Sequence, residues 1–275
     1  MEDLRPVVLT IAGVDPSGGA GVLADVRTIA AFGCFPAAAI TSLTFQNTTG
    51  VFGSVHQTVE VLNSQVIAVV EDSPIAAMKT GMLPTAEIVE AVVKLCESEE
   101  LPAPVVDPVM LSTSGHDLID ERAFGLLKDR LLKQARVVTP NIPEAERFVG
   151  FEIRSEADMH RAAETIQSWG VRSVLIKGGH RPIQNEITEV HEAIDLLLDE
   201  NGVVTIYRTE YLDLGDVHGS GCTLSAAIAA CLAKEMKLAD AVAEAKSFVT
   251  DAIRTSQPIG RGARPLFGHR LNRVS

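Results

Sequence analysis

Short apolar runs alternate with longer amphipathic segments from one end of the chain to the other. Runs rich in apolar and β-branched residues predict buried strands at residues 7–12, 37–43, 75–79, 104–106, 136–139 and 173–176. Amphipathic spacing predicts helices between them, at residues 20–32, 59–71, 86–96, 121–132 and 156–169. Because strands that alternate with helices form βαβ units, we expect an α/β fold with a mainly parallel sheet covered on both faces.

The C-terminal part of the chain changes this pattern. Two apolar runs, 193–198 and 203–207, flank a turn sequence that ends in Asn201-Gly202, which predicts an antiparallel hairpin at the edge of the sheet. A helix over 222–233 is apolar or small on every side and is therefore expected to be buried. A last helix over 238–253 is amphipathic, with Lys246 at the margin of its apolar stripe. Without repeats or a Pro/Gly-rich linker, we expect a single domain over residues 1–275.

The charge balance limits the possible partners. Thirty-six Asp and Glu against 24 Lys and Arg give a net charge of −12, and only 4% of residues are aromatic. An acidic surface repels nucleic acid and anionic membranes, so we expect neither as a partner. Five arginines follow the last acidic residue, Asp251, at positions 254, 261, 264, 270 and 273, and we interpret them as a solvated basic tail.

Cysteine spacing and hydropathy point to an intracellular chain. The four cysteines show no C-x-x-C spacing, which indicates neither a zinc site nor a disulfide framework. The first residues are acidic and no long apolar run follows them, so we expect no signal peptide and no membrane span. The predicted location is the cytoplasm.

Polar and turn-forming residues follow four of the predicted strands. The first strand runs into Gly13, and three others end at Asp107, at Asn141 with Glu144 close behind, and at Lys177. Ligands of open parallel sheets bind outside the carboxyl ends of the strands, so these side chains are candidates for one shared site.

The first glycine cluster resembles a dinucleotide-binding turn but lacks its partner residue. Gly19-Ala20-Gly21-x-x-Ala24 fits the spacing, yet residues 26–59 contain no Asp or Glu to bind ribose hydroxyls. The turn is also too long, and the absence of any Gly-Lys dipeptide excludes a Walker-type loop. We therefore reject both kinds of nucleotide site here.

A second glycine cluster leads directly into the buried helix. Gly219-Ser220-Gly221-Cys222 would allow successive backbone N–H groups at the helix start to point at one anion. A thiol at such a position is expected to have a pKa below about 8.5, which makes Cys222 a candidate base. A structural helix start packed with small residues explains the same pattern equally well.

Seven motifs, read together in order, resemble one family. They are Asp15-Pro16-Ser17-Gly18-Gly19-Ala20-Gly21, Gln46-Asn47-Thr48, Lys79-Thr80-Gly81-Met82-Leu83, Asp107-Pro108-Val109-Met110, Thr139-Pro140-Asn141-x-x-Glu144-Ala145, Lys177-Gly178-Gly179-His180 and His218-Gly219-Ser220-Gly221-Cys222-Thr223-Leu224-Ser225. The chain from about Leu9 to Ser247 thereby resembles the hydroxymethylpyrimidine/phosphomethylpyrimidine kinases of thiamine biosynthesis, in the ribokinase superfamily.

The resemblance implies a ribokinase-like three-layer α/β/α sandwich that binds ATP with Mg²⁺ at the carboxyl edge of the sheet, and it leaves open a requirement for a monovalent cation. It implies that Gly219, Ser220, Gly221 and Cys222 surround the phosphoryl group, with Cys222 as the base and Lys246 near the γ-phosphate. Further roles implied are ATP binding by Lys177, Asn141 and Asp107, and Mg²⁺ binding, largely through water, by Glu144 and Asp107.

For the acceptor, the resemblance implies that Gln46 contacts the edge of the pyrimidine ring and Met82 packs on it, with Asp25 and Gly13 nearby. It also implies a homodimer. The chain departs from the family in three places. Phe45 before Gln46 is expected to reshape the ring pocket, residues 260–265 replace a Gly-x-Gly-x-Gly-Pro tail, and Ser220 stands where Thr is common, which is a mild change.

We thus expect ATP-dependent phosphorylation of 4-amino-5-hydroxymethyl-2-methylpyrimidine and of its monophosphate. The main alternative is a pyridoxal kinase of the same fold, since both acceptors are flat heteroaromatic rings with a hydroxymethyl arm. A non-catalytic sensor of the same fold is a second alternative, and a sugar kinase is disfavoured because such enzymes carry Asp where this chain has Cys222.

Overall fold

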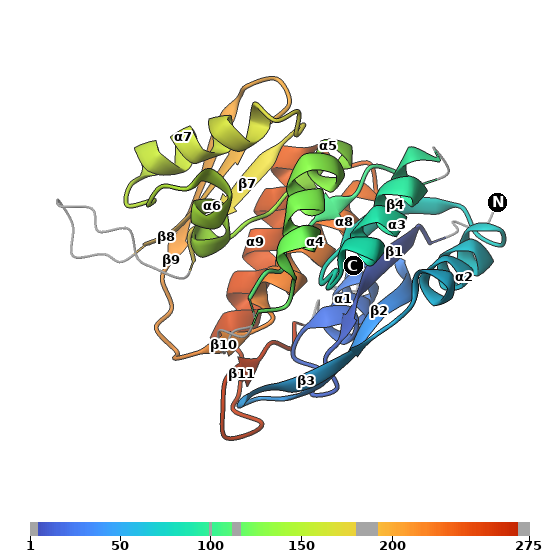
Figure 1. Cartoon of the computed structure of the whole chain (residues 1–275). Helices are drawn as coiled ribbons and strands as arrows, with labels where there is room; N and C mark the ends of the chain where they lie inside the picture. Colours follow the sequence, from blue (N-terminus) through green and yellow to red (C-terminus); the bar gives the residue numbers. More distant parts are fainter. Residues whose placement is uncertain (1–4, 99–100, 112–116, 180–191, 269–275) are drawn as a thin grey trace.

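The computed structural model describes residues 5–98, 101–111, 117–179 and 192–268. In this part of the chain a nine-stranded sheet has the spatial order β3-β2-β1-β4-β5-β6-β7-β8-β9 (Figure 1). Its strands are β1 (Val7–Val14), β2 (Phe35–Asn47), β3 (Gly50–His56), β4 (Ile75–Thr80), β5 (Val105–Val106), β6 (Val137–Val138), β7 (Val174–Lys177), β8 (Glu192–Leu198) and β9 (Val204–Glu210).

The pairing of the strands confirms the predicted mainly parallel sheet. The strands from β2 to β7 run parallel in that order, whereas β3, β8 and β9 pair antiparallel with their neighbours. The β8–β9 hairpin lies at one edge, as predicted, and its turn brings Leu198 opposite Val204. All carboxyl ends of the parallel strands therefore meet at one edge of the sheet.

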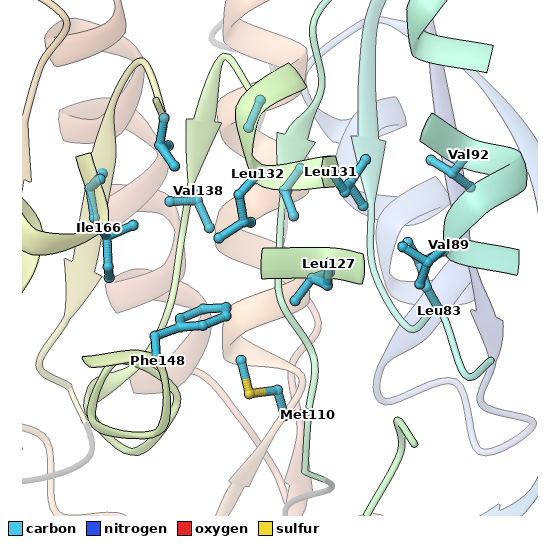
Figure 2. Close-up of a cluster of buried hydrophobic side chains, with 14 of the residues drawn as sticks. Leu83, Val89, Val92, Met110, Leu127, Leu131, Leu132, Val138, Phe148 and Ile166 are labelled. Atoms are coloured by element: carbon cyan, nitrogen blue, oxygen red, sulfur yellow. The ribbon is translucent and has the colours of Figure 1, made fainter. Parts of the chain in front are cut away.

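Helices cover both faces of the sheet. They are α1 (Gly21–Ala31), α2 (Val59–Val70), α3 (Ala86–Glu97), α4 (Glu121–Leu126), the π-helical turn η1 (Leu127–Leu131), α5 (Leu132–Gln134), α6 (Ile142–Val149), α7 (Glu156–Gln167), α8 (Ser220–Leu232) and α9 (Leu238–Arg254). Helices α2 to α7 pack on one face (Figure 2), and α1, α8 and α9 pack on the other. The predicted three-layer α/β/α sandwich is confirmed.

Adjacent strand residues divide between the two cores because side chains alternate along a strand. In β5, Val106 contributes to the core beneath α2–α7 and Val105 to the core beneath α1, α8 and α9. Strands buried on both sides read as continuous apolar runs, which is the pattern that located them in the sequence.

Polar side chains begin most of the helices. Thr58, Thr85, Asp120 and Ser155 each accept a backbone N–H at the start of α2, α3, α4 and α7. In contrast, α8 begins at Gly219, and no side chain of the described residues caps it. The backbone N–H groups of its first turn therefore remain available to a ligand.

Four elements were not predicted: β3, α6, β10 (Val217–His218) and β11 (Arg264–Pro265). The strand β3 pairs with the end of β2 after a turn at 48–49, and α6 follows Asn141 directly. A two-stranded sheet joins β10 to β11. The last pairing links distant segments and leaves no local pattern, whereas the Asn141-x-x-Glu144 spacing is a recognisable capping box that marks the start of α6.

The structure describes the cysteines and the helices that the sequence analysis considered, whereas some residues named there lie outside the described ranges. None of the four cysteines, all of which lie in the described ranges, forms a disulfide. Among the described helices, none has the length and apolar character of a transmembrane span. His180 of the sixth motif, and Arg270 and Arg273 of the basic tail, lie outside the described residues.

Candidate active site

Two adjacent cavities lie at the carboxyl edge of the parallel strands. The first cavity encloses about 350 Å³ and the second about 230 Å³. Five residues line both cavities and so form a shared wall: Lys177, Asp216, Val217, Ser220 and Gly221. Most of the candidate residues line the first cavity: Gly13, Gln46, Met82, Asp107, Asn141, Glu144, Lys177, Gly219, Ser220, Gly221 and Cys222.

The glycine corner before α8 is shaped by a close backbone contact. Gly219 has φ +86°, and a Cβ atom at this position would lie 1.9 Å from the carbonyl oxygen of Gly19. Only glycine fits such a conformation and such a contact. The corner turns the start of α8 toward the shared wall, where N–H groups and the helix dipole favour a negatively charged group.

Cys222 lies in the first turn of α8 and lines the first cavity. Burial raises the pKa of the Cys222 thiol to about 11; the charge of Lys79 opposes this shift, and the carboxylates of Asp107 and Asp25 reinforce it. The predicted low pKa is therefore wrong for this structure. The helix start alone favours a thiolate, but burial near two carboxylates outweighs that effect.

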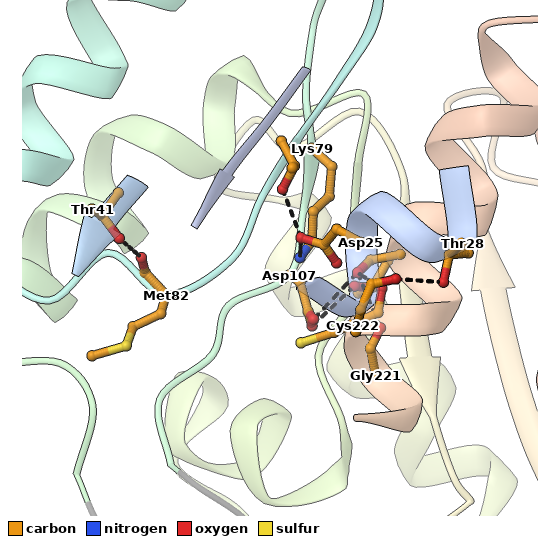
Figure 3. Close-up of polar contacts among 12 residues, drawn as sticks. Asp25, Thr28, Thr41, Lys79, Met82, Asp107, Gly221 and Cys222 are labelled. Atoms are coloured by element: carbon orange, nitrogen blue, oxygen red, sulfur yellow. Dashed lines mark hydrogen bonds and ion pairs between the residues drawn. The ribbon is translucent and has the colours of Figure 1, made fainter. Parts of the chain in front are cut away.

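Behind Cys222 lies a wholly buried ion pair that the sequence analysis did not identify (Figure 3). Lys79 Nζ lies 2.8 Å from Asp25 Oδ2, and neither side chain is exposed. Thr10 Oγ1 also donates to Asp25 Oδ2, at 2.6 Å. Burial works against the charge of Lys79, but Asp25 outweighs it and raises the pKa of Lys79 above its usual value.

This ion pair corrects the predicted place of Asp25. Lys79 lines the first cavity, but Asp25 does not. Lys79 and Thr10 both bond to Asp25 Oδ2, whereas Oδ1 is buried without a hydrogen-bond partner among the described residues. Asp25 thus lies one layer behind the residues that line the cavity. It acts on the cavity through its ion pair with Lys79 and through its charge, which helps to raise the pKa of Cys222.

Asp107 connects the strand ends to the shared wall. Its Oδ1 lies 2.9 Å from Lys177 Nζ, and its Oδ2 accepts a hydrogen bond from Ser225 Oγ at 3.3 Å. Burial raises the pKa of Asp107, but the charges of Lys177 and Lys79 outweigh burial and hold it below its usual value. Asp107 is therefore an anion that fixes Lys177 between the two cavities.

Glu144 and Asn141 form the capping box of α6 beside this pair. Glu144 Oε2 accepts from the backbone N–H of Asn141, and Asn141 Oδ1 accepts from that of Glu144, both at 2.8 Å. Burial raises the pKa of Glu144 to about 7; Lys177 opposes the shift and Asp107 adds to it. A buried carboxyl destabilised by a neighbouring carboxylate is a position where a cation would be favourable.

The described residues contain no group of three or more His, Cys, Asp or Glu side chains arranged to hold a metal ion. Mg²⁺ is usually held by one or two carboxylates together with water and substrate phosphates. Glu144 and Asp107 supply that donor set, so the residues present fit a nucleotide-bound Mg²⁺ rather than a protein-only site.

Gln46 lies on β2 and reaches the first cavity together with Thr44. Phe45 points to the other side of the strand, where it is 54% exposed and its ring covers Gly53. The prediction that Phe45 reshapes the ring pocket is therefore wrong, because side chains alternate along a strand. His218 and Asp15 had no role in the predictions from sequence. His218 contacts Gln46 directly, and Asp15 contacts His218.

Met82 and Gly13 form another part of the first cavity. Thr41 Oγ1 donates to the backbone carbonyl of Met82 at 2.7 Å (Figure 3), and a Cβ atom at Gly13 would lie 3.0 Å from the Met82 sulfur. The thioether thus packs closely on the backbone at the end of β1. This arrangement offers a flat, apolar surface next to the polar Gln46.

Lys246 belongs to the second cavity rather than the first. Its Nζ lies 2.7 Å from Asp195 Oδ2 and donates to the carbonyl of Ala193 at 3.2 Å. Asp195, which the sequence analysis missed, also accepts the backbone N–H of Gly178 at 2.9 Å. Lys246 is therefore held on the far side of the shared wall from Cys222.

The divergent tail packs against the β2–β3 hairpin. The backbone N–H of Ala263 donates to the carbonyl of Thr48 at 2.8 Å, and a Cβ atom at Gly262 would lie 1.9 Å from the same oxygen. The N–H of Arg264 donates to the carbonyl of Asp216 at 2.8 Å. The tail thus closes the outer side of the site although its sequence departs from the family pattern.

The sequence profile of phosphomethylpyrimidine kinase matches residues 15–267. The chain belongs to the phosphomethylpyrimidine kinase family. A hydroxymethylpyrimidine/phosphomethylpyrimidine kinase of Streptomyces coelicolor is 41% identical over 261 residues, which cover 95% of this chain and 93% of the relative. Family membership identifies the chain as a kinase and decides against the sensor alternative.

Two further comparisons show the range of the family. A thiamine biosynthesis bifunctional protein of Geobacter sulfurreducens is 40% identical over 262 residues, and this chain spans 52% of its length. The crystal structure of an ADP complex of Bacillus subtilis pyridoxal kinase has a TM-score of 0.85 at 32% identity, covering 96% of this chain and 97% of that one. The same fold thus occurs in kinases named for pyrimidine and for pyridoxal.

Proposed function

We propose that this chain transfers the γ-phosphoryl group of ATP to the hydroxymethyl oxygen of 4-amino-5-hydroxymethyl-2-methylpyrimidine, and then to its monophosphate. The observation that carries the proposal is that Gln46 and Cys222 line one cavity together with the uncapped start of α8. A ring held at Gln46 has its hydroxymethyl arm beside a thiol and a set of backbone N–H donors.

In this proposal the acceptor ring packs on Met82 and Gly13, and Gln46 bonds to its edge. The hydroxymethyl oxygen bonds to the γ-phosphorus as the bond to ADP breaks, and its proton passes to Cys222 Sγ in the thiolate form, which is the minor form of this thiol at neutral pH. The transition state is loose, so catalysis depends mainly on positioning and on charge stabilisation. The N–H groups of the Gly219–Cys222 corner and Lys177 provide that stabilisation at the shared wall.

The nucleotide is assigned to the second cavity, with its terminal phosphate at the shared wall, beside Lys177, Ser220 and Gly221. The ADP complex of the structurally similar pyridoxal kinase supports a nucleotide site in this fold. When bound, Mg²⁺ neutralises phosphate charge, and Glu144 and Asp107 are the residues that would hold it, largely through water. Lys246, fixed by Asp195, adds positive charge on the nucleotide side.

Pyridoxal is the second candidate acceptor, supported by the structural similarity to a pyridoxal kinase. The deciding experiment compares kcat/KM for both acceptors on one preparation of wild-type enzyme, with Gln46→Ala in parallel. We expect the higher value for the aminopyrimidine, and a Gln46→Ala variant that raises the acceptor KM more than the ATP KM. A clearly higher value for pyridoxal would reverse the order of the two functions.

The homodimer and the cytoplasmic location stay predictions. Leu43, Phe45 and Val55 leave an apolar surface exposed on the β2–β3 hairpin, which is a candidate surface for the second copy. Light scattering of the wild type and of a Phe45→Ser variant tests this: a dimer that dissociates in the variant supports the assignment. A monomeric wild type contradicts it.

A further inference from the structure

One ring nitrogen of His218 is close to two other polar groups. His218 Nε2 lies 2.8 Å from Asp15 Oδ2 and 2.9 Å from the terminal amide of Gln46. The ring is nearly buried and lies against Gly19, where a Cβ atom would be 2.3 Å from His218 Cδ2. Backbone packing therefore holds the imidazole in one place, beside the residue assigned to the acceptor ring.

Asp15 can only accept hydrogen bonds from its neighbours. Its Oδ1 accepts from the backbone N–H and the hydroxyl of Ser17, and its Oδ2 accepts from the backbone N–H of Ala20 at 2.9 Å. Burial raises the pKa of Asp15, but the hydrogen bonds from His218 and Ser17 outweigh burial and keep it below its usual value. Because Asp15 is an anion and can only accept, His218 Nε2 carries a hydrogen and donates a hydrogen bond to Asp15 Oδ2.

A protonated Nε2 determines which end of the Gln46 amide faces it. If the amide nitrogen of Gln46 faced His218, two donors would meet at 2.9 Å. A half-turn of the amide places Oε1 there instead, where it shares the single Nε2 hydrogen with Asp15 Oδ2 in a three-centre hydrogen bond. The O and N ends of an amide have the same outline, so hydrogen bonding decides between them.

The other end of the amide gives the same answer independently. Thr44 Oγ1 lies 3.2 Å from the second terminal atom of Gln46 and donates its single hydrogen to the carbonyl of Val14 at 2.9 Å. Thr44 can therefore only accept from Gln46, which requires the amide nitrogen on that side. On one side, Gln46 therefore donates to Thr44, and Thr44 donates to the carbonyl of Val14. On the other side, His218 Nε2 directs its hydrogen at Asp15 and at Gln46.

We propose that His218, held by Asp15, is a positioning residue that fixes the orientation of the Gln46 amide and so selects the acceptor ring. The fixed amide keeps one lone pair on Oε1 and one N–H for the cavity. Such a pair matches an amino group next to a ring nitrogen, and an aminopyrimidine presents that edge. A pyridine whose hydroxyl lies two positions from the ring nitrogen does not present it. This selectivity rests on the proposed function.

The kinetic test compares His218→Leu, which removes the donor, with His218→Gln, whose amide can replace Nε2. We expect His218→Leu to lower kcat/KM for the aminopyrimidine by about tenfold through the acceptor KM, as the loss of one buried hydrogen bond implies. The KM for ATP stays unchanged, and His218→Gln recovers most of the loss. His56→Leu, on the exposed end of β3, is the matched control and retains the wild-type values.

A double-mutant cycle shows whether His218 acts through Gln46. In a Gln46→Ala background, His218→Leu should cause no further loss of acceptor affinity. Losses that add, or an equal rise in the ATP KM, overturn the inference.

A spectroscopic measurement separates this inference from the proposed function. Long-range ¹H–¹⁵N correlation spectra of the histidine rings, with His218 assigned from the His218→Gln spectrum, show whether Nε2 carries a proton. A bare Nε2 overturns the inference even if the wild type phosphorylates the aminopyrimidine. A protonated Nε2 in an enzyme inactive on every pyrimidine supports the amide orientation and overturns the proposed function instead.

Discussion

Gly19 and Gly219 lie so close together that neither position has room for a side chain. A Cβ atom at Gly219 would approach the carbonyl oxygen of Gly19 to 1.9 Å, and one at Gly19 would strike the His218 ring at 2.3 Å. The loop after β1 and the start of α8 are thereby interlocked. Both the anion-binding corner and the position of His218 depend on this contact.

We predict that Gly219→Ala lowers both stability and activity. The variant combines a left-handed backbone with a backbone clash, which should cost about 2 kcal/mol or more in the free energy of unfolding. Gly125→Ala, in α4 with open space around it, is the control and should be neutral or more stable by about 0.5–1 kcal/mol. Chemical denaturation and kcat/KM measured on both variants check the prediction, and a fully active Gly219→Ala contradicts it.

Replacing the proposed base should affect turnover and not nucleotide binding. Cys222→Ser leaves the backbone N–H groups of α8 in place, so we expect the KM for ATP to stay within about twofold while kcat falls by about a hundredfold. Cys96→Ser, in α3 and away from both cavities, is the matched control. An unchanged kcat in Cys222→Ser would remove Cys222 as the base.

The Cys222 thiol should react slowly with alkylating reagents at neutral pH. With a pKa of about 11, only about one thiol in a thousand is ionised at pH 8, and this fraction rises tenfold per pH unit. Peptide-resolved mass spectrometry of iodoacetamide labelling at pH 7 to 10 measures the rate for this cysteine alone. We expect a continuous rise with no plateau, and a plateau below pH 9 is the contrary result.

Breaking the buried ion pair should destabilise the fold strongly. Burial already raises the pKa of Asp25 although Lys79 opposes the shift. Lys79→Met leaves this unexposed carboxyl to carry an unpaired charge or to take up a proton, which should cost about 3–5 kcal/mol in the free energy of unfolding. Lys79→Met combined with Asp25→Leu removes both charges and should recover a large part of that loss. Urea denaturation of the three proteins is the measurement, and a double variant less stable than Lys79→Met refutes the account.

Much of the fold could be predicted because its strands and helices carry local patterns. Alternating burial in strands such as β5 and the amphipathic stripe of α9 follow from side-chain direction alone. The pairing of β10 with β11 could not be predicted, because Val217 and Arg264 meet only after the chain has folded. The same holds for the contact between His218 and Gln46.

For the site, residue identity was easier to predict than electrostatic environment. The strand-end argument brought Asp107, Asn141 and Lys177 to one edge, and all three line the first cavity. The low pKa expected for Cys222 was wrong, because the prediction considered its own helix and neither the burial of the thiol nor the two carboxylates near it. Lys246 likewise lines the second cavity rather than the first, since Asp195 holds it there.

The residues common to both cavities form a partition that faces a cavity on either side. Lys177, Ser220 and Gly221 cannot adjust to an occupant on one side without presenting a changed surface on the other. If the phosphoryl donor and the acceptor occupy the two cavities as proposed, each changes the affinity of the enzyme for the other. Thermodynamic linkage requires the two affinities to change by the same factor, whichever ligand binds first.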